Sequence, residues 1–575
     1  MKTPGAWKKL VPAALALAAA AVWLTGLDGE LVFDDEFTVG ANTFLGAVSR
    51  PLDLFRAPAA SPFRDRPVTA ATFQASYLLG GRAPWAYRLL NIVIHILAAL
   101  TLYGIVRRSL AGGRAGPRLA TGAPAAAAVA ALLWALHPLQ TESVTYITQR
   151  CEALAGLFYL LTLYLVIRGS VSPRPGAWYA GAVGACLLGV GSKATAVTAP
   201  LAVLLYDRVF LSRSWREVWA RRRLYLGLAV SWVVLGALVA GTDYPDIRTH
   251  GVGEYLRTQP AILLHYLRLA VLPDRLCLNY NWAPAGWGAA FIPGLALLGL
   301  LAAAAALWRF LPPAGYACAW TLLALAPTSS VFPLEDLAFE HRVYLALAGP
   351  AALVGCWGYL LFSRSRRRAL GIGIAAGVLA ALSARTVSRN RDYRAAEGLW
   401  RQCLSLRPIN PRAHNNLGNL LLRRGLRAEA LAQYRAAVAS DPGYEAGLYN
   451  LGNWYLAEGD PAAAERWFRL TLEVNPHSAA AANNLAIALF RRGRTEEAEA
   501  LLVETERLHP ADPAAPYNLG VLMLATGRED RARLCFARAR ELDPDKKRRS
   551  EYLAVPPPPR VVPPSGPGGA TSKGR

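Results

Sequence analysis

Eleven apolar segments follow one another through residues 10–386, separated by short polar loops. They lie near residues 10–27, 87–106, 123–137, 151–167, 177–191, 194–211, 224–240, 289–310, 315–328, 343–362 and 369–386. Several reach the length of about 20 residues that a helix needs to cross a bilayer. The 575-residue chain is also 54% hydrophobic, which excludes a single soluble domain. We therefore expect an all-α, polytopic transmembrane bundle of about eleven spans.

The basic residues between these segments predict how the bundle faces the membrane. The net charge of +23 comes mainly from arginine. With eleven spans the basic loops all fall on one side, which the positive-inside rule identifies as the cytoplasm. These residues are Lys2, Lys8, Lys9, Arg107, Arg108, Arg114, Arg118, Arg168, Arg174, the arginines of 208–223 and those of 364–368. Charge arranged in this way is a topology signal, so we expect the lipid bilayer as a partner and no nucleic acid.

A second pattern begins after Thr386, where the sequence repeats with a period of 34 residues. Small residues where paired helices cross, glycine at each turn and proline closing each unit are typical of tetratricopeptide repeats. The repeated positions are Asn416-Leu417-Gly418, Asn450-Leu451-Gly452, Asn484-Leu485-Ala486 and Asn518-Leu519-Gly520; Gly425, Gly459, Gly493 and Gly527; Ala430, Ala464, Ala498 and Ala532; and Pro408, Pro442, Pro476, Pro510 and Pro544. An α-solenoid should therefore follow the transmembrane bundle.

The two patterns predict three regions: a transmembrane domain at 1–388, the repeats at 389–548 and a tail at 549–575. The repeat region contains four full units preceded by a half-unit, whose missing first helix is the end of the last span. The tail is rich in proline and glycine and is expected to be disordered.

The repeats place one asparagine at the same position of every unit, namely Asn416, Asn450, Asn484 and Asn518. Two interpretations are open. These side chains could line a concave face and bind the backbone of an extended acceptor peptide, or they could form hydrogen bonds within the helix stack.

Three consecutive carboxylates, Asp34, Asp35 and Glu36, come shortly after the first apolar segment. Adjacent anions repel one another, and a charge left in the hydrocarbon costs about 2.5–3.5 kcal/mol or more. A hydrated loop is one interpretation. The other is a site at the bilayer surface that needs a general base, for which Asp34 and Asp35 are both candidates.

The remaining loops on the same predicted side carry further ionisable groups. The candidates for binding a phosphate-containing substrate are Arg66, His137, Glu142, Arg150, Lys193, Glu340 and Arg342. Arginine suits phosphate by its planar fork and lysine by its point charge. Single arginines at span ends can instead be interfacial anchors, and His137 before Pro138 can simply end a helix. Lys193 is harder to explain structurally, because it lies on the side where topology does not favour positive charge.

These residues, in this order, resemble the transmembrane and tetratricopeptide repeat-containing O-mannosyltransferases and their bacterial relatives. The matching stretches are Phe33-Asp34-Asp35 with Asn42; Arg66-Pro67-Val68-Thr69; Tyr87-Arg88-Leu89-Leu90-Asn91 with His95; His137-Pro138-Leu139-Gln140-Thr141-Glu142-Ser143-Val144; Ser192-Lys193; Leu205-Tyr206-Asp207; Gln259-Pro260 with His265-Tyr266; and Glu340-His341-Arg342-Val343-Tyr344. The resemblance covers roughly residues 10–545. It departs from the family at Ala194, where an acidic residue is common, and at Gln149-Arg150, where Gly-Arg is commoner.

The resemblance implies a GT-C membrane glycosyltransferase fold and a metal-independent, inverting transfer from a polyprenyl-phosphate sugar, with no cofactor. It places the catalytic base in the acidic pair Asp34-Asp35. We expect a single mannose or other hexose to pass to a hydroxyl of a protein acceptor presented by the repeats. The alternatives are a ligase or polymerase that uses an oligosaccharide on a lipid diphosphate, and a non-enzymatic membrane-anchored repeat scaffold. In a bacterial inner membrane, the site and repeats would face the periplasm.

The seven cysteines, Cys151, Cys186, Cys277, Cys318, Cys356, Cys403 and Cys535, show no CxxC or zinc-finger spacing. Several lie inside apolar segments, where cysteine behaves as a small hydrophobic residue. From the sequence we expect neither a disulfide framework nor a metal site.

Overall fold

The computed structural model of the chain describes residues 7–48, 51–57, 61–240, 251–330 and 332–542. These residues form helices, turns and loops, without a strand, as the all-α prediction requires. The chain divides into two compact units, Met1–Arg407 and Pro408–Arg575, which we call the membrane unit and the repeat unit. The predicted tail at 549–575 lies outside the described residues.

Each of the eleven predicted apolar segments contains a helix of the membrane unit. These helices are α1 (Trp7–Trp23), α3 (Pro84–Ala111), α4 (Pro117–Ala135), α6 (Arg150–Ser170), α7 (Pro175–Val190), α8 (Ala199–Tyr206), α10 (Arg222–Val239), α12 (Trp287–Phe310), α13 (Pro312–Leu325), α14 (Ala348–Phe362) and α15 (Arg368–Asp392). Seven of the described helical stretches are long and apolar enough to cross a membrane. The helices α1, α7, α13 and α14 are shorter, with 14 to 17 residues.

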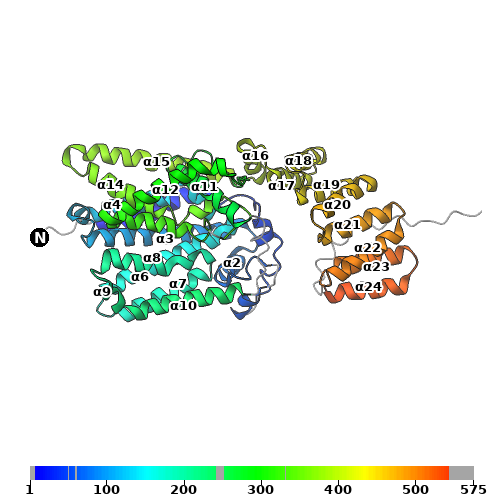
Figure 1. Ribbon diagram of the computed structural model, residues 1–575, viewed down its shortest axis with the longest axis horizontal. Coiled ribbons are helices and arrows are strands. Elements are labelled where there is room, and N and C mark those ends of the chain that lie inside the picture. The colour runs from blue at the N-terminus through cyan, green and yellow to red at the C-terminus, as the bar shows by residue number, and fades with distance from the viewer. Residues whose placement is uncertain (1–6, 49–50, 58–60, 241–250, 331, 543–575) are drawn as a thin grey trace, which may run out of the picture. The chain divides into compact units, whose positions relative to one another are not determined.

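The long helices pack side by side and run roughly parallel to one another (Figure 1). Helix α4 packs between α3 and α14, because its alanines leave room for close approach. Ala126, Ala127, Ala130 and Ala131 are all fully buried. A Cβ atom at Gly355 of α14 would lie 2.8 Å from the Ala126 carbonyl oxygen, so this crossing requires glycine.

Proline begins many of these helices. It occupies the first turn of α3, α4, α7 and α13, and also of α2 (Pro67–Gly80). The first-turn position suits proline, because the N–H group that proline lacks would have no intrahelical partner there.

Short elements gather where α3 and α6 begin and where α4 and α15 end. They are η2 (Glu36–Gly40), η4 (Pro138–Gln140), α5 (Thr141–Val144), η5 (Ile147–Gln149) and η9 (Glu340–Val343). Helix α5 contacts α3, α6, α15 and η9, and η4 contacts η9. Glu36, Glu142, Glu340 and Arg342 lie in these elements, and Asp35, His137 and Arg150 directly adjoin them.

The last apolar helix continues directly toward the repeats. Helix α15 runs without a break to Asp392, and α16 (Ala396–Leu406) follows after three residues. Both belong to the membrane unit, so the two units part at Arg407 and Pro408, later than the predicted boundary at 388 and 389.

The repeat unit consists of four helix pairs, as its 34-residue period predicts. The pairs are α17 (Pro411–Arg423) with α18 (Arg427–Ser440), α19 (Glu445–Ala457) with α20 (Pro461–Val474), α21 (Ala479–Arg491) with α22 (Thr495–Leu508), and α23 (Ala514–Ala525) with α24 (Glu529–Leu542). The four turn glycines have φ between +78° and +81°, a left-handed conformation that favours glycine. A Cβ atom at Gly452 would lie 2.5 Å from the Phe468 ring, which explains the small residue where the helices cross.

Candidate active site

The acidic loop after α1 is tied to the segment that links α4 and α6. The buried guanidinium of Arg88 donates to the carbonyl oxygens of Leu27, Glu30 and Thr145 at 3.5, 2.7 and 3.2 Å. Phe33 has a φ of +51°, a strained conformation for a residue with a bulky side chain. Its ring stacks on Tyr146 and meets the edge of Trp400. The loop is therefore held in one conformation directly before Asp34.

Asp35 is completely buried and anchors this loop. Its Oδ1 accepts hydrogen bonds from the backbone N–H and the hydroxyl of Thr148, at 2.8 and 2.7 Å. Its Oδ2 accepts from the Val32 N–H at 3.3 Å. Burial raises the pKa of Asp35 to about 7, although these donors act in the opposite direction. With both oxygens occupied and no exposed surface, Asp35 fixes the loop to η5.

Asp34 is the accessible member of the acidic pair. It is half-buried, and its Oδ2 accepts a hydrogen bond from the Tyr146 hydroxyl at 2.7 Å. The Asp34 backbone N–H donates to the same phenol oxygen at 3.2 Å. Tyr146 thus holds the carboxylate in a defined orientation without covering it. The structure therefore distinguishes the two residues, which the sequence could not: Asp35 is an anchor, and Asp34 can be reached by another molecule.

Lys193 lies beside the first turn of α6. Its Nζ is 2.8 Å from Glu152 Oε1 and 3.5 Å from Gln149 Oε1. Glu152 also accepts a hydrogen bond from the Thr195 hydroxyl at 3.2 Å. The Lys193 side chain is 16% exposed, so it is mostly shielded from bulk water but is not completely buried.

The start of α2 brings Arg66 to the same place. The N–H of Val68 donates to the Gly191 carbonyl at 3.1 Å, and the Thr69 hydroxyl donates to the Ser192 carbonyl at 2.9 Å. These bonds hold the 66–69 segment against the turn that carries Lys193. Arg66 is 30% exposed, and its Nη1 lies 4.0 Å from the Cys151 Sγ.

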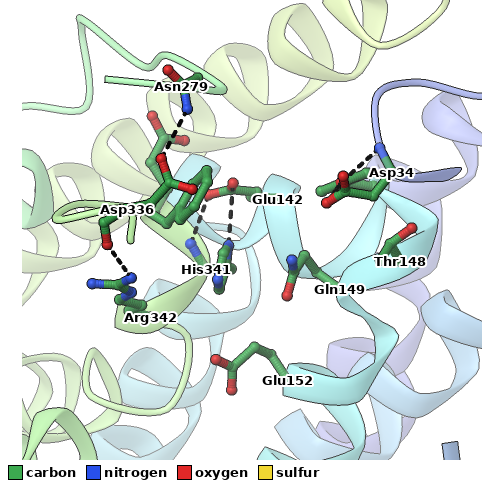
Figure 2. Close-up of polar contacts among 12 residues, drawn as sticks. Asp34, Glu142, Thr148, Gln149, Glu152, Asn279, Asp336, His341 and Arg342 are labelled. Atoms are coloured by element: carbon green, nitrogen blue, oxygen red, sulfur yellow. Dashed lines mark hydrogen bonds and ion pairs between the residues drawn. The ribbon is translucent and has the colours of Figure 1, made fainter. Parts of the chain in front are cut away.

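Three cations act together on His341. Burial, followed by the charges of Lys193, Arg342 and Arg66, lowers the pKa of His341 well below its usual value. Glu152, Thr195 and Arg342 also line one small cavity. In Figure 2, Asp34, Thr148 and Gln149 lie on one side and Glu142, His341 and Arg342 on the other, with Glu152 below Gln149. The region is therefore a polar site with local positive charge.

Two predicted glutamates are bonded to the segments around this region. Glu142 Oε2 accepts from the His341 N–H at 2.7 Å, and Glu340 Oε1 accepts from the Cys277 N–H at 2.6 Å and the Tyr280 hydroxyl at 2.7 Å. Burial, then the neighbouring Glu340, raises the pKa of Glu142 well above its usual value. His341 Nδ1 lies 3.2 Å from Glu142 Oε1, and burial shifts the pKa of both groups in the direction that disfavours their charged forms. Both glutamates position η9.

Two other predicted phosphate ligands are buried and bonded to neighbouring groups. Arg150 is fully buried, and its Nε, Nη1 and Nη2 donate to Asn91 Oδ1, the Thr72 carbonyl and the Tyr87 carbonyl at 2.6, 2.8 and 2.8 Å. A phosphate could reach Arg150 only if those bonds broke. His137 is also buried: its Nδ1 accepts from the Leu139 N–H and its Nε2 lies 3.2 Å from the Ala270 carbonyl.

Arg342 has a mixed role. Its terminal nitrogens donate to the carbonyls of Asp336 and Leu337 at 2.5 and 2.9 Å, which holds the loop before η9. The same side chain lines the small cavity beside Glu152. Arg342 therefore contributes mainly its positive charge to the site, because its terminal nitrogens already donate to backbone carbonyls.

The repeat asparagines form a hydrogen-bonded ladder. Asn450 Nδ2 donates to Asn415 and Asn419 at 2.8 and 3.2 Å, each in the preceding repeat. Asn484 Nδ2 donates likewise to Tyr449 and Asn453, and Asn518 Nδ2 donates to Asn483. The Nδ2 of Asn416, in the first full repeat, makes no hydrogen bond. Of the two sequence interpretations, the structure therefore shows hydrogen bonding within the stack for Asn450, Asn484 and Asn518.

Four polar residues of the site were not predicted from the sequence: Tyr146, Thr148, Gln149 and Glu152. A signal for two of them was present, because Gln149 and Glu152 are three residues apart where a helix begins and so share a face. Among the described residues, no group of three or more His, Cys, Asp or Glu side chains could hold a metal ion.

Another cavity lies elsewhere in the membrane unit. Its lining is mainly apolar, with Leu102, Leu110, Leu119, Leu160 and Trp320. It lies at the end of α3 and the start of α4, whereas the polar site lies at the opposite ends of these helices. It lacks a carboxylate, so it does not compete with the polar site as a place for proton transfer.

Comparison with known proteins supports the same two-part organisation. The family model for dolichyl-phosphate-mannose-protein mannosyltransferases matches residues 61–239. Tetratricopeptide repeat models match residues 382–445, 455–506 and 496–547. The first match contains Arg66, Arg150 and Lys193 and the helices α3 to α10, and the others contain the repeats.

Curated relatives extend across both parts. The chain is 26% identical to the human protein O-mannosyl-transferase TMTC4 over 494 residues, which cover 75% of this chain and 66% of the relative. It is 24% identical to Drosophila melanogaster protein O-mannosyl-transferase Tmtc3, with 65% and 48% covered. The chain thus spans slightly less than two thirds of the first relative and about half of the second. Among solved structures, the crystal structure of MamA protein is similar to 28% of this chain and covers 86% of that structure, at 21% identity and a TM-score of 0.24.

Proposed function

Because the chain belongs to the family of tetratricopeptide repeat-containing protein O-mannosyltransferases, we propose that it is an integral-membrane glycosyltransferase. It transfers one sugar, mannose or another hexose, from a polyprenyl phosphate to a hydroxyl group of a protein acceptor. The transfer occurs at the polar site described above, at the membrane surface.

The observation that carries this proposal is the accessible carboxylate of Asp34 beside a cationic region. A general base must be within hydrogen-bond reach of the proton that it removes. Asp34 is half-buried and oriented by Tyr146, so it can approach an acceptor hydroxyl, whereas Asp35 cannot. Asp34 would take the hydroxyl proton while the acceptor oxygen forms a bond to the anomeric carbon of the sugar.

The bond between that carbon and the phosphate oxygen breaks in the same step. Attack from the face opposite the phosphate inverts the configuration at the anomeric carbon. The leaving polyprenyl phosphate gains negative charge, which Lys193, Arg66 and the field of Arg342 would stabilise. Positive side chains supply this charge, so the proposed step requires no metal ion or cofactor.

Glu152 positions Lys193 in this proposal. It is paired with Lys193 at 2.8 Å and would hold the ammonium group in place before the donor binds. An incoming phosphate would compete with Glu152 for Lys193, so the cation is positioned in advance rather than ordered on binding.

The repeats would present the acceptor protein. The asparagine ladder keeps neighbouring repeats in register, so acceptor contacts would come from other side chains of the stack and from Asn416. The site and the repeats would face the compartment opposite the basic loops, which is the periplasm in a bacterial inner membrane.

The test is transfer of labelled mannose from a polyprenyl-phosphate donor to protein by the purified full chain. Asp34→Asn should lower the rate by about 10²–10⁴-fold, the usual contribution of a general base. The matched control is Glu36→Gln, which changes the exposed neighbouring carboxylate and should retain activity. Each variant is used only if it elutes as folded protein at the wild-type volume.

Three results would overturn parts of the proposal. Full activity of Asp34→Asn would exclude Asp34 as the base. Transfer of a whole oligosaccharide from a lipid diphosphate would establish a ligase or polymerase instead. Failure with every lipid-linked donor, together with rescue of a deletion strain by a transfer-dead chain, would establish a scaffold.

A further inference from the structure

Two cysteines from distant parts of the membrane unit meet beneath the site. Cys277 lies in the segment after α11 (Val252–Val271), and Cys403 lies in α16. They are 126 residues apart in the chain, yet their Sγ atoms are 2.8 Å apart. Both are buried, with 1% and 0% of their surface exposed.

This separation is shorter than the usual contact between two unbonded sulfur atoms. A disulfide requires about 2.05 Å between the sulfurs, so closing the bond needs a movement of less than about 1 Å. Both Sγ atoms also lie close to the carbonyl oxygen of Asn279, at 3.1 and 3.0 Å. The two side chains therefore point to one place, as a bonded pair must.

The neighbours of the pair connect it to both sides of the site. On one side, the Cys277 N–H and the Tyr280 hydroxyl both donate to Glu340, directly before His341. On the other side, α16 carries Trp400, whose ring meets Phe33 next to Asp34. A bond between the two cysteines would thus join the support of η9 to the support of the acidic loop.

We propose that Cys277 and Cys403 form a disulfide bond in the mature protein. The bond forms during folding, before the thiols are buried, by exchange with an external disulfide. One thiolate attacks a sulfur of the donor disulfide and forms a mixed disulfide. The second thiolate then displaces the donor, so two electrons pass to the donor sulfurs and the two thiol protons are released, to the donor thiolates or to water.

The predicted topology places this pair on the side opposite the basic loops. Compartments on that side of a cell membrane are commonly oxidising, which allows a structural disulfide to persist. The other cysteines differ in place: Cys151, Cys186, Cys318 and Cys356 lie in helices of the bundle, and Cys535 lies in the repeats. No spacing in the sequence pairs Cys277 with Cys403, since the pairing depends on the packing of α16 within the membrane unit.

Alkylation of the full-length protein tests the proposal. The chain is purified from membranes without reductant, denatured in acid to stop thiol exchange, and then alkylated with excess iodoacetamide in denaturant at mildly alkaline pH, where thiols ionise. The products are mapped by mass spectrometry, with and without prior reduction. The unreduced protein should carry two fewer alkyl groups, and a linked peptide pair containing Cys277 and Cys403 should disappear on reduction. Complete alkylation of both cysteines without reduction would overturn the proposal.

Two variants provide the controls. In Cys403→Ser, Cys277 should become alkylated without reduction, whereas in Cys535→Ser the linked peptide pair should persist. Reductant should lower the apparent melting temperature of the wild type and of Cys535→Ser by several degrees. The double variant Cys277→Ser/Cys403→Ser should melt at the lower temperature and be insensitive to reductant. A wild type whose melting temperature ignores reductant, although the linked pair is lost, would exclude a structural role for the bond. None of these measurements depends on sugar transfer.

Discussion

The membrane unit and the repeat unit are both rich in arginine, but they place it differently. In the membrane unit, Arg88, Arg150 and Arg389 are among the largest fully buried side chains. In the repeat unit, arginines form surface pairs with glutamates, such as Arg427 with Glu458 and Arg507 with Glu504. The guanidinium groups of Arg88 and Arg150 donate to three acceptors each, which fixes the buried charge in place, whereas a surface pair contributes about 0–1 kcal/mol.

This contrast explains which unit can hold a reaction site. Arg88 fixes the acidic loop through three carbonyl oxygens, and Asp35 fixes it through Thr148. Such bonds constrain single atoms to single positions. The repeats instead gain stability from identical contacts between neighbours, which tolerate variation on the surface.

The largest effect in this comparison should follow removal of Arg150. Arg150→Met removes the donors to the Asn91 side chain and to the Thr72 and Tyr87 carbonyls, and an unsatisfied buried polar group costs about 1–3 kcal/mol. The variant should show a strong loss of monodisperse protein in detergent and a much lower apparent melting temperature. Arg174→Met, which removes an exposed arginine of the same unit, is the control and should resemble the wild type.

A smaller effect, of a few kcal/mol at most, should appear as a pH dependence of the stability of the folded protein that originates at Asp35. Its pKa is about 7 in the folded protein and 3.8 for an unperturbed aspartate. The folded state therefore binds this proton more tightly, and the stability gained is complete below about pH 4 and lost as the pH rises through about 7. Asp35→Asn should weaken the fall in melting temperature between about pH 5 and about pH 8. An unchanged slope would show that other buried carboxyls, such as Glu142 and Glu340, determine it.

In the repeat unit, a turn glycine should have a moderate and local effect. Gly459 has a φ of +81°, where a side chain costs about 1–2 kcal/mol. Gly459→Ala should raise amide hydrogen exchange in α19 and α20 more than in α23 and α24. Gly443→Ala is the matched control, because a Cβ atom there meets only an ordinary contact at 3.5 Å. Equal exchange across all repeats in Gly459→Ala would mean that the array opens as a single unit.

The smallest effect should come from a surface pair. Arg427→Ala removes the contact with Glu458, both side chains being more than a third exposed. We expect a change below about 1 kcal/mol in the opening free energy from hydrogen exchange, and a smaller one in high salt. A loss comparable to that of Arg150→Met would contradict the contrast between the units.

The sequence predicted those features that depend on local spacing. The 34-residue period located every repeat helix pair, and the apolar segments located the bundle helices. Asp34 and Lys193 stood out as candidates, since a carboxylate run and an isolated lysine are unusual at those positions. The buried contacts of Arg150 and His137 could not be predicted, because the acceptors of Arg150 come from α2 and α3, and His137 meets the end of α11. Nothing local distinguishes an arginine that binds phosphate from one that binds carbonyl oxygens.

The sequence could not distinguish Asp34 from Asp35 for the same reason: the residues that separate them lie far away in the chain. Adjacent residues have equal composition and equal local charge, and only Thr148 and Tyr146, more than 100 positions later, separate the anchor from the accessible carboxylate. Likewise, the asparagine ladder depends on how one repeat stacks on the next, with donors and acceptors 31 and 35 residues apart.

Helices α15 and α16 both belong to the membrane unit, and this has a consequence for how such chains evolve. The half-unit belongs to the membrane unit, so the joint between the two units falls inside the array rather than at its edge. Whole repeats beyond that joint can be gained, lost or exchanged by recombination without altering any residue that supports Asp34. A lineage can therefore lengthen or replace its array while the residues around Asp34 stay the same.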